Sequence, residues 1–372
     1  MLDRYSDNLA GLTTRHRRRA LVARSGIDFS SNDYLAMARD PALGDAVRAA
    51  IARGVPIGSG GSRLLRGNDP EHEALEREAA AFYGSEAALF LSSGFVANSA
   101  LLSTLPQRED HIFHDALVHA SAHEGMRLAR CGRTETPHND AGAVDDAIAR
   151  WRSQGGTGRP WIVVESLYSM DGDRAPLDAL AAIADRHEAF LIIDEAHATG
   201  VFGAGGRGLA AALQARENVI VLRTLGKALG CEGALICCAA VLRDFLVNRA
   251  RGFIFSTAPS PLMAAAGRAA IGLVAGADDR RDRLRALWTH AAARLARHGA
   301  HGTDSPILPL VLGDEERTMA VAGRLQLAGH DVRGIRPPTV PPGSSRLRIA
   351  LTLNVATTDI DRLDDALTAA LA

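Results

Sequence analysis

Short apolar runs rich in branched side chains recur along much of the chain, and such runs are typical of buried strands. Stretches with helical periodicity separate them, and the clearest helix is predicted to begin at Asp69 and Pro70, which suit a cap and a first turn. Its apolar face carries Leu75, Ala79 and Phe82. The alternation predicts an α/β domain with a mostly parallel sheet. The predicted strands cover residues 87–92, 161–166, 190–194, 219–224 and 234–238.

The pattern changes after about residue 272. Long stretches rich in Ala, Arg and Leu come first, followed by strand-like runs at 306–312 and 346–351 and by a final amphipathic helix. This order predicts a smaller α+β domain at the C-terminus. The expected parts are an N-terminal segment over residues 1–36, a large domain over 37–272 and a small domain over 273–372.

The composition excludes several classes of protein. The 42 basic and 43 acidic side chains leave a formal charge of −1, so neither a nucleic-acid nor a membrane partner is expected. The longest uncharged apolar stretch, residues 233–242, is far shorter than the roughly 18 residues of a membrane-spanning helix. Asp3, Arg4 and Asp7 interrupt the apolar run that a signal peptide needs. The four cysteines show no C-x-x-C spacing, which suits reduced thiols, and we expect a cytoplasmic protein.

Polar side chains lie at the ends of two of the predicted strands: Asp194 and His197 at the end of one, and Lys227 just after the other. In open parallel sheets, ligands bind beyond the carboxyl ends of the strands. Pyridoxal phosphate requires a lysine for a Schiff base, a carboxylate at the ring nitrogen and a cradle for its phosphate. Lys227 is a candidate for that lysine, Asp194 for that carboxylate, and the Thr224 hydroxyl for a hydrogen bond to the phosphate.

Each of these signals has an ordinary structural alternative. A single lysine is most often a solvated loop residue, but Lys227 lies between two glycines after a buried strand in a chain that is poor in lysine. Gly94 and Phe95 open a helix after a strand and can offer backbone amides to a phosphate. His119 can stack on a cofactor ring or merely sit at a helix end. Residues 203–208 match G-x-G-x-x-G, but they do not follow directly from a strand, which disfavours a dinucleotide-binding dehydrogenase.

Eight segments along nearly the whole chain are FSSNDYL (29–35), GSGGSR (58–63), SSGF (92–95), HAS (119–121), ESLYSMDGD (165–173), DEAHATG (194–200), TLGK (224–227) and RPPTVPPGSSRLRIALT (336–352). In this order they resemble the α-oxoamine synthases, pyridoxal phosphate enzymes of aspartate-aminotransferase fold (fold type I) that condense an amino acid with an acyl thioester and release carbon dioxide. The C-terminal segment most resembles the branch that joins L-alanine to a pimeloyl thioester in biotin biosynthesis. The resemblance implies a homodimer with shared active sites, and coenzyme A or acyl carrier protein as the acyl carrier.

The resemblance also implies a role for individual residues, and no metal ligand among them. The implied catalytic residues are Lys227, His119, Asp194 and His197. The implied cofactor-binding residues are Gly94, Phe95, His119, Ser169, Asp194, His197, Thr224 and Lys227, with Ser256 and Thr257 reaching the phosphate of a partner subunit. The implied substrate-binding residues are Arg15, Asn32, His119, Thr339 and Arg348.

Four positions are uncertain matches to the family pattern or depart from it. Arg15 is the best match to a substrate-contacting arginine, but it lies in a basic run that equally suits solvent. Cys231 and Glu232 stand where small or apolar residues are usual, and an acidic group there would raise the pKa of the cofactor lysine. Ala36 replaces a common glycine. The alternatives that stay open are a related synthase using glycine or serine, and a non-catalytic subunit of the same fold.

Overall fold

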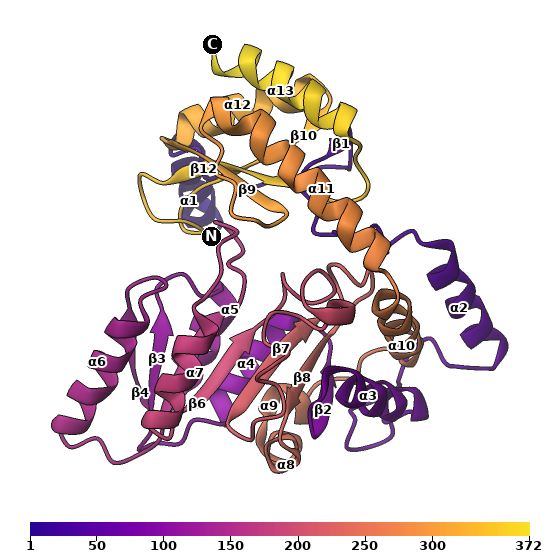
Figure 1. The fold of residues 1–372 in the computed structure, drawn as a ribbon, viewed down its shortest axis with the longest axis vertical. Coiled ribbons are helices and arrows are strands. Elements are labelled where there is room, and N and C mark those ends of the chain that lie inside the picture. Colours follow the sequence, from indigo (N-terminus) through magenta and orange to yellow (C-terminus); the bar gives the residue numbers. More distant parts are fainter. The chain divides into compact units, whose positions relative to one another are not determined.

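The computed structural model describes residues 1–372, which form two compact units drawn in Figure 1. We call residues 35–169 and 174–281 the sheet unit. Residues 1–34, 170–173 and 282–372 form the other, which we call the terminal unit because it contains both ends of the chain. The division into residues 1–36, 37–272 and 273–372, which the sequence pattern suggested, stays a prediction. None of the helices combines the length and the hydropathy needed to cross a bilayer.

A seven-stranded sheet organises the sheet unit, in the order β2-β8-β7-β6-β5-β3-β4. The strands from β7 to β4 are parallel, whereas β8 runs antiparallel to both of its neighbours. All five predicted strands are confirmed, and the mostly parallel sheet is confirmed with them. The strands are β2 (Ala87–Leu91), β3 (His111–Asp115), β4 (Gly132–Thr136), β5 (Pro160–Glu165), β6 (Phe190–Asp194), β7 (Val219–Thr224) and β8 (Ala234–Cys238).

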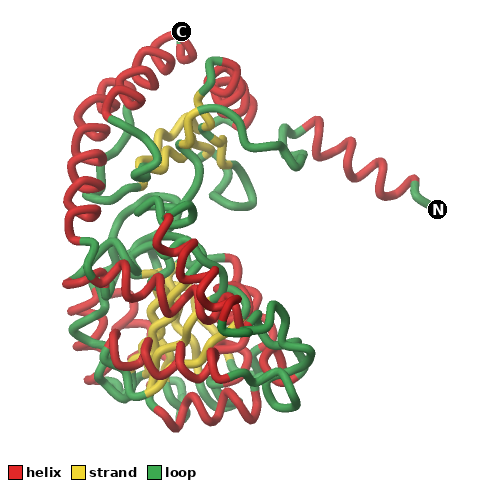
Figure 2. Tube along the Cα trace, turned by 90° about the vertical axis from the view of Figure 1, so that its right-hand side faces the viewer, coloured by secondary structure: helices red, strands yellow, loops and turns green.

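Helices flank this sheet (Figure 2), and the strand side chains alternate between two apolar clusters. In β7, Ile220 and Leu222 belong to one cluster, whereas Val219 and Val221 belong to the other. Both faces of the sheet are therefore buried, which is why its strands read as continuous apolar runs. The helices are α2 (Pro41–Ala52), α3 (Pro70–Tyr83), α4 (Gly94–Thr104), α5 (Ala120–Leu128), α6 (Ala141–Ser153), α7 (Leu177–Arg186), α8 (Ala240–Arg249), α9 (Arg251–Ile254) and α10 (Pro261–Ala275).

The predicted start of α3 is confirmed. The Asp69 carboxylate caps this helix by accepting a hydrogen bond from the amide of Glu71 at 2.9 Å. Leu75 and Ala79 are fully buried, as the apolar face predicts. The helix ends at Gly84, whose φ of 79° is a left-handed conformation that glycine adopts without strain.

The terminal unit contains a three-stranded antiparallel sheet, β11-β12-β9, and a short parallel pair, β1-β10. The two predicted C-terminal strands are confirmed as β9 and β12, and the predicted final helix as α13, which buries Ile360, Leu363 and Leu367. The strands are β1 (Ile27–Asp28), β9 (Ile307–Gly313), β10 (His330–Asp331), β11 (Arg333–Ile335) and β12 (Ser345–Ala350). The helices are α1 (Asp3–Thr14), α12 (Glu315–Leu327), α13 (Thr357–Leu371) and α11 (Asp278–Leu295), which begins in the sheet unit.

The backbone at Ala36, the position where the family pattern has glycine, is strained. Its φ is 53°, in the left-handed region that alanine adopts at a cost of roughly 1–2 kcal/mol. Glycine carries no such penalty, because it lacks the Cβ atom that clashes in this conformation. The common glycine of the family pattern therefore corresponds to a backbone requirement that this chain meets with a strained alanine.

Candidate functional site

The candidate site lies at the carboxyl edge of the sheet, where parallel strands end together. Asp194 is the last residue of β6, and Glu165, the last residue of β5, is paired with it in register. Thr224 ends the neighbouring strand β7, and Lys227 lies three residues further along. The Lys227 Nζ atom is 2.8 Å from the Nε2 atom of His197. The structure thus brings together the three polar residues that the sequence singled out, and Lys227 is the only lysine in the chain.

Asp194 accepts hydrogen bonds on both carboxylate oxygens. Its Oδ1 atom accepts from the amide of Ala196 at 2.9 Å, and its Oδ2 atom accepts from the side-chain amide of Asn98 at 2.7 Å. Asn98 lies on α4, is almost fully buried, and was missed by the sequence analysis although it lies just beyond the SSGF segment. These two donors fix the plane of the carboxylate, so Asn98 is a positioning residue for Asp194.

Asn98 also connects Asp194 to His119. Its amide donates a second hydrogen bond, at 3.0 Å, to the hydroxyl of Ser121, which lies 2.7 Å from Nδ1 of His119. The Ser121 backbone amide donates to the same Nδ1 atom at 3.2 Å, so this ring nitrogen is the acceptor and the ring proton resides on Nε2. Burial lowers the pKa of His119 against the opposing effect of Asp194, which keeps the ring neutral at pH 7.

His119 therefore does two things at once. It is the N-cap residue of α5, the ordinary structural role that the sequence allowed for it. It also has a fixed tautomer whose Nε2–H is not used by this cap. The imidazole of His119 is neutral and carries its proton on Nε2, so it is suited to lie against a flat ligand.

Glu165 is a buried carboxyl group that the sequence analysis did not single out, although it opens the ESLYSMDGD segment. Burial raises its pKa well above the ordinary value, and the neighbouring Asp194 raises it further. Its Oε2 atom accepts a hydrogen bond from the amide of Ser169 at 3.1 Å, while its Oε1 atom is buried without a hydrogen-bond partner. The site therefore contains one carboxyl that favours the protonated form, beside Asp194.

Backbone and hydroxyl groups that suit a phosphate lie at the carboxyl ends of β7 and β2, which are separated in the sheet by β8. The Thr224 hydroxyl accepts a hydrogen bond from the amide two residues further on, at 3.2 Å. At the start of α4, the Ser93 hydroxyl accepts from the amide of Val96 at 3.2 Å. The amides of Gly94 and Phe95 lie outside this cap, at the positive end of the helix dipole.

The substrate candidates of the terminal unit fall into two groups. Arg348, buried in β12, donates a hydrogen bond of 3.0 Å from Nη2 to the Asn32 side-chain oxygen, to which Tyr34 also donates at 3.1 Å. Arg348 and Asn32, predicted separately, are thus partners. Thr339 is exposed and accepts a hydrogen bond of 3.3 Å from Arg19.

Arg15 lies apart from both groups of the terminal unit. Its side chain is exposed and donates from Nε to the Gly11 carbonyl of its own helix, at 3.0 Å. Arg19, and not Arg15, is the member of the basic run that contacts a predicted substrate residue, Thr339. The local sequence contains no signal that distinguishes the two arginines.

The remaining predicted positions are near the surface or beside the lysine turn. Ser256 and Thr257 are exposed between α9 and α10. Burial raises the pKa of the Cys231 thiol to about 12, so this cysteine is unreactive at neutral pH. Glu232 is exposed to solvent, where water weakens the effect of its charge on nearby groups, and its predicted effect on Lys227 stays a prediction.

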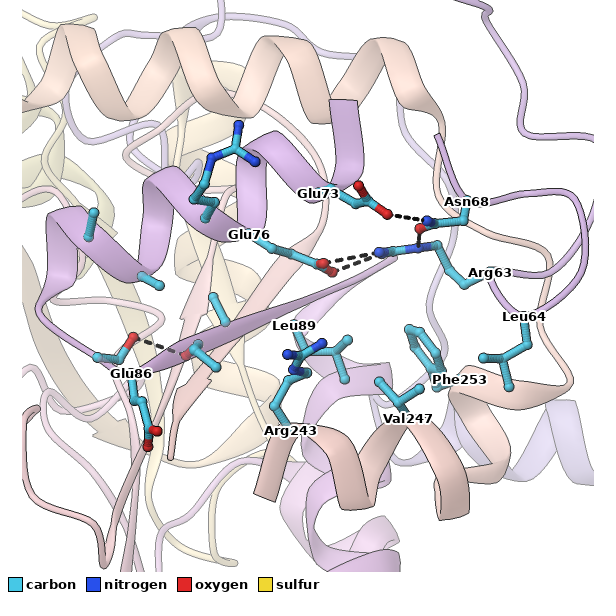
Figure 3. Close-up of a pocket in the computed structure, with 16 residues that line it drawn as sticks. Arg63, Leu64, Asn68, Glu73, Glu76, Glu86, Leu89, Arg243, Val247 and Phe253 are labelled. Atoms are coloured by element: carbon cyan, nitrogen blue, oxygen red, sulfur yellow. Dashed lines mark hydrogen bonds and ion pairs between the residues drawn. The ribbon is translucent and has the colours of Figure 1, made fainter. Parts of the chain in front are cut away.

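A pocket of about 670 Å³ lies elsewhere in the sheet unit, lined by residues of α3, β2, α8 and α9 (Figure 3). Two of its charged groups, Arg63 and Glu76, already satisfy each other: Arg63 donates to both oxygens of Glu76 at 2.8 and 3.0 Å, and to Asn68 at 2.6 Å. None of the predicted site residues lines this pocket. We therefore place the chemistry at the carboxyl edge of the sheet.

Comparison with known proteins gives one consistent result. A family model, aminotransferase class I and II, matches residues 24–367. The 8-amino-7-oxononanoate synthase of Anaeromyxobacter dehalogenans is 44% identical over 351 residues, which cover 94% of this chain and 87% of that protein. The 8-amino-7-oxononanoate synthase 2 of Bacillus subtilis is 40% identical, over 90% of this chain and 85% of that protein.

Solved structures agree with these relatives. A serine palmitoyltransferase from S. paucimobilis, solved with bound pyridoxal phosphate, superposes with a TM-score of 0.90 at 26% identity, covering 99% of this chain and 97% of that one. The 8-amino-7-oxononanoate synthase of Francisella tularensis superposes with a TM-score of 0.77 at 27% identity, covering 93% and 98%. The predicted fold class and cofactor are confirmed by these similarities.

Proposed function

The chain belongs to the aminotransferase class I and II family and is a pyridoxal-phosphate-dependent enzyme, and from this premise we propose the reaction that it catalyses. The reaction is the condensation of L-alanine with a pimeloyl thioester, which gives 8-amino-7-oxononanoate, carbon dioxide and the free thiol carrier in biotin biosynthesis. The observation that carries the proposal is the 44% identity, over 94% of this chain, to a relative that bears the name of this synthase.

The residues at the carboxyl edge of the sheet fit the cofactor. When bound, pyridoxal phosphate supplies an aldehyde that bonds to a lysine and a ring that withdraws electrons from the substrate. Lys227 would form that bond, Asp194 would hold the ring nitrogen, and the neutral ring of His119 would lie against the cofactor. The support for this fit is that Asp194 is oriented by two donors and His119 by the Asn98–Ser121 connection.

Five further groups complete the proposed cofactor contacts. The amides of Gly94 and Phe95 and the hydroxyl of Thr224 would hold the phosphate, because all three follow or end strands of the same sheet, β2 and β7, at their carboxyl ends. Ser169 and His197 would form hydrogen bonds to the cofactor, His197 at the phenolic oxygen of the ring. His197 is suited to this role because its Nε2 atom is already within hydrogen-bond distance of Lys227.

Arg348 would bind the carboxylate of L-alanine. Its planar guanidinium can form two parallel hydrogen bonds to a carboxylate, which a lysine cannot do. Asn32, its present partner, orients it and would contact the substrate as well. Thr339 and Arg15 are the other proposed substrate contacts. Arg19 is a second candidate for the substrate-contacting arginine of the basic run, because it donates a hydrogen bond to Thr339.

Lys227 would also move the proton. Its Nζ atom, once free, would take the proton from Cα of the amino acid as a general base. The new carbon–carbon bond then forms between that Cα and the thioester carbonyl carbon, and the carbon–sulfur bond breaks, so that the thiolate leaves and takes a proton from solvent. The alanine carboxylate departs as carbon dioxide, and Cα regains a proton from Nζ. Alanine, thioester and one solvent proton are thereby balanced by product, carbon dioxide and thiol.

The competing functions have less support. A dehydrogenase is disfavoured because residues 204–206 form a short 3-10 turn and the residues that follow, 209–215, form turns. No helix therefore follows the glycine-rich segment. A non-catalytic subunit is disfavoured by the Lys227–His197 contact. A synthase that uses glycine or serine is the second candidate, because solved neighbours include serine palmitoyltransferases.

The proposal includes partners and a compartment. We expect a homodimer in which the exposed Ser256 and Thr257 reach the phosphate of the second copy. The thioester carrier would be coenzyme A or acyl carrier protein, and the compartment the cytoplasm. Neither a nucleic acid nor a membrane is part of the proposed function.

Product analysis by mass spectrometry tests the proposed function. Enzyme loaded with pyridoxal phosphate is incubated with pimeloyl thioester and, in separate reactions, L-alanine, glycine or L-serine. We expect 8-amino-7-oxononanoate from alanine at a rate at least tenfold above the other amino acids, and none with Lys227→Ala. A faster reaction with glycine or serine would show that the enzyme is the second candidate, a synthase that uses glycine or serine. Turnover by Lys227→Ala would refute the assignment of the site.

A further inference from the structure

A fully buried ion pair lies directly behind the candidate site. Arg223 and Glu195 both have side chains that are 0% exposed. Glu195 follows Asp194 at the end of β6, and Arg223 precedes Thr224 at the end of β7. Because side chains alternate along a strand, Arg223 extends from the face of β7 opposite to that of Thr224. The pair therefore joins the two strand ends that carry the site without being part of it.

The pair also fixes the connection between these strands. Arg223 donates from Nη1 to Glu195 Oε2 at 2.7 Å and to the Arg207 carbonyl at 2.5 Å, and from Nη2 to the Gln214 side-chain oxygen at 3.0 Å. The second oxygen of Glu195 accepts from the amide of Ala210 at 2.8 Å. Two side chains thus hold three points of the segment over residues 207–214.

The surroundings leave these two side chains one arrangement. The Tyr83 ring packs against the Arg223 guanidinium, 4.0 Å from its central carbon. A Cβ atom at Gly208 would lie 1.9 Å from Glu195 Oε2, and the φ of Gly208 is 97°. Only glycine allows the chain to pass so close to the carboxylate, so the segment is shaped around the pair.

The pair is linked to the cofactor lysine through a turn. The Glu195 carbonyl accepts hydrogen bonds from the amides of Ala198 at 3.0 Å and Thr199 at 2.9 Å, and this turn carries His197. His197 in turn lies 2.8 Å from Lys227 Nζ. A displacement of Glu195 would therefore move the imidazole relative to the lysine.

We propose that the Arg223–Glu195 pair positions His197 against Lys227, and that its two members are positioning residues and not catalytic residues. An intact buried pair held by several hydrogen bonds fixes one geometry, whereas loss of one partner leaves an uncompensated charge. Nη1 and Nη2 of Arg223 make these bonds, and its Nε atom is buried without a hydrogen-bond partner. The proposal rests on the proposed function, because it concerns the lysine that would bind the cofactor.

Three variants test the proposal: Glu195→Gln, Arg223→Met and the double variant. Each single variant leaves part of the network without a partner, so we expect a lower melting temperature of the cofactor-free protein. The double variant removes both charges, and we expect it to recover most of that loss. We also expect its kcat to remain about tenfold to a hundredfold below the wild type, because misplaced catalytic groups cost rates of this order. Its KM for alanine should stay within about twofold, since Arg348 is unchanged.

Visible circular dichroism of the bound cofactor, normalised to its absorbance, separates positioning from stability. We expect an altered signal in the double variant even though it is stable. The matched control is Glu76→Gln on α3, which weakens the ion pair between Glu76 and Arg63, whose shorter contact is 2.8 Å. It should lower the melting temperature and leave both the dichroism and kcat unchanged.

Two results have distinct meanings. A double variant with the dichroism and kcat of the wild type would overturn the positioning role of Arg223 and Glu195. A wild type that binds no pyridoxal phosphate would instead overturn the proposed function, before any variant is compared.

Discussion

Asn98→Ala is the perturbation that tests the architecture of the site most sharply. It removes a hydrogen bond of 2.7 Å to the Asp194 carboxylate and one of 3.0 Å to the Ser121 hydroxyl. A bond to a charged group contributes about 2 kcal/mol and a neutral one about 1 kcal/mol, so we expect the free energy of unfolding to fall by about 3 kcal/mol. We also expect pyridoxal phosphate to bind about tenfold more weakly, because Asp194 and His119 lose their common support.

Urea unfolding of the cofactor-free protein and fluorescence titration with pyridoxal phosphate measure these two effects. Asn354→Ala is a suitable control, because it removes an exposed amide-to-carboxylate hydrogen bond of 3.2 Å to Asp33, and we expect it to change the unfolding free energy by less than about 0.5 kcal/mol. Equal stability losses in the two variants, with unchanged cofactor affinity in Asn98→Ala, would refute the reasoning.

Asn98→Asp extends the same prediction to pH. The new carboxyl must carry a proton to donate to Asp194, since two carboxylates about 4 Å apart repel by roughly 4 kcal/mol at an effective dielectric constant of 20. Its pKa in the folded protein would therefore lie above the unfolded value, so stability is retained at low pH and lost as the pH rises through the folded pKa. Unfolding free energies measured between pH 5 and pH 8 should fall with pH more steeply than in the wild type. Parallel profiles would contradict the proximity of the two groups.

Three other predictions concern single residues. Ala36→Gly should stabilise the protein by about 1 kcal/mol, because the φ of 53° suits glycine; an unchanged or lower urea midpoint would show that the strain is absent. Glu165→Gln should make the free energy of unfolding fall less steeply with rising pH. The raised pKa of Glu165 means that the folded protein binds this proton more tightly than the unfolded chain, and the stability that the proton contributes is lost as the pH rises above the ordinary glutamate pKa. Profiles identical to those of the wild type would argue for an ionised Glu165. Arg348→Lys should raise the KM for alanine about tenfold or more through loss of the bidentate geometry, and steady-state kinetics with an unchanged KM would remove Arg348 from the substrate site.

The strands of the sheet unit were predictable because both faces of the sheet are buried. Continuous apolar runs such as residues 219–224 have few alternatives to a central strand. In contrast, β4 was not predicted, because residues Gly132–Thr136 form an edge strand with largely exposed side chains and no apolar run. The pair β1-β10 joins residues about 300 positions apart through two residues each, and no local pattern encodes such a pairing.

The candidate site was predictable where it depends on strand ends. Asp194, His197 and Lys227 follow buried parallel strands, and the topology of such a sheet brings their positions to one edge. Asn98 was not predictable, because its partner Asp194 is 96 residues away and an asparagine within a helix carries no signal of its own. Arg15 stays a prediction, and the sequence does not distinguish it from Arg19 for a related reason, since the difference depends on where α1 ends relative to Thr339.

The most direct test of the account is reductive trapping of pyridoxal phosphate on the purified protein, read by intact-mass and peptide mass spectrometry. Lys227 is the only lysine in the chain, so no other lysine side chain can form the covalent bond. We predict one pyridoxyl group per chain, on the peptide that contains Lys227, and none in Lys227→Ala. A protein that gains no label, or gains it only at the N-terminal amine, would contradict the placement of the cofactor at the carboxyl edge of the sheet.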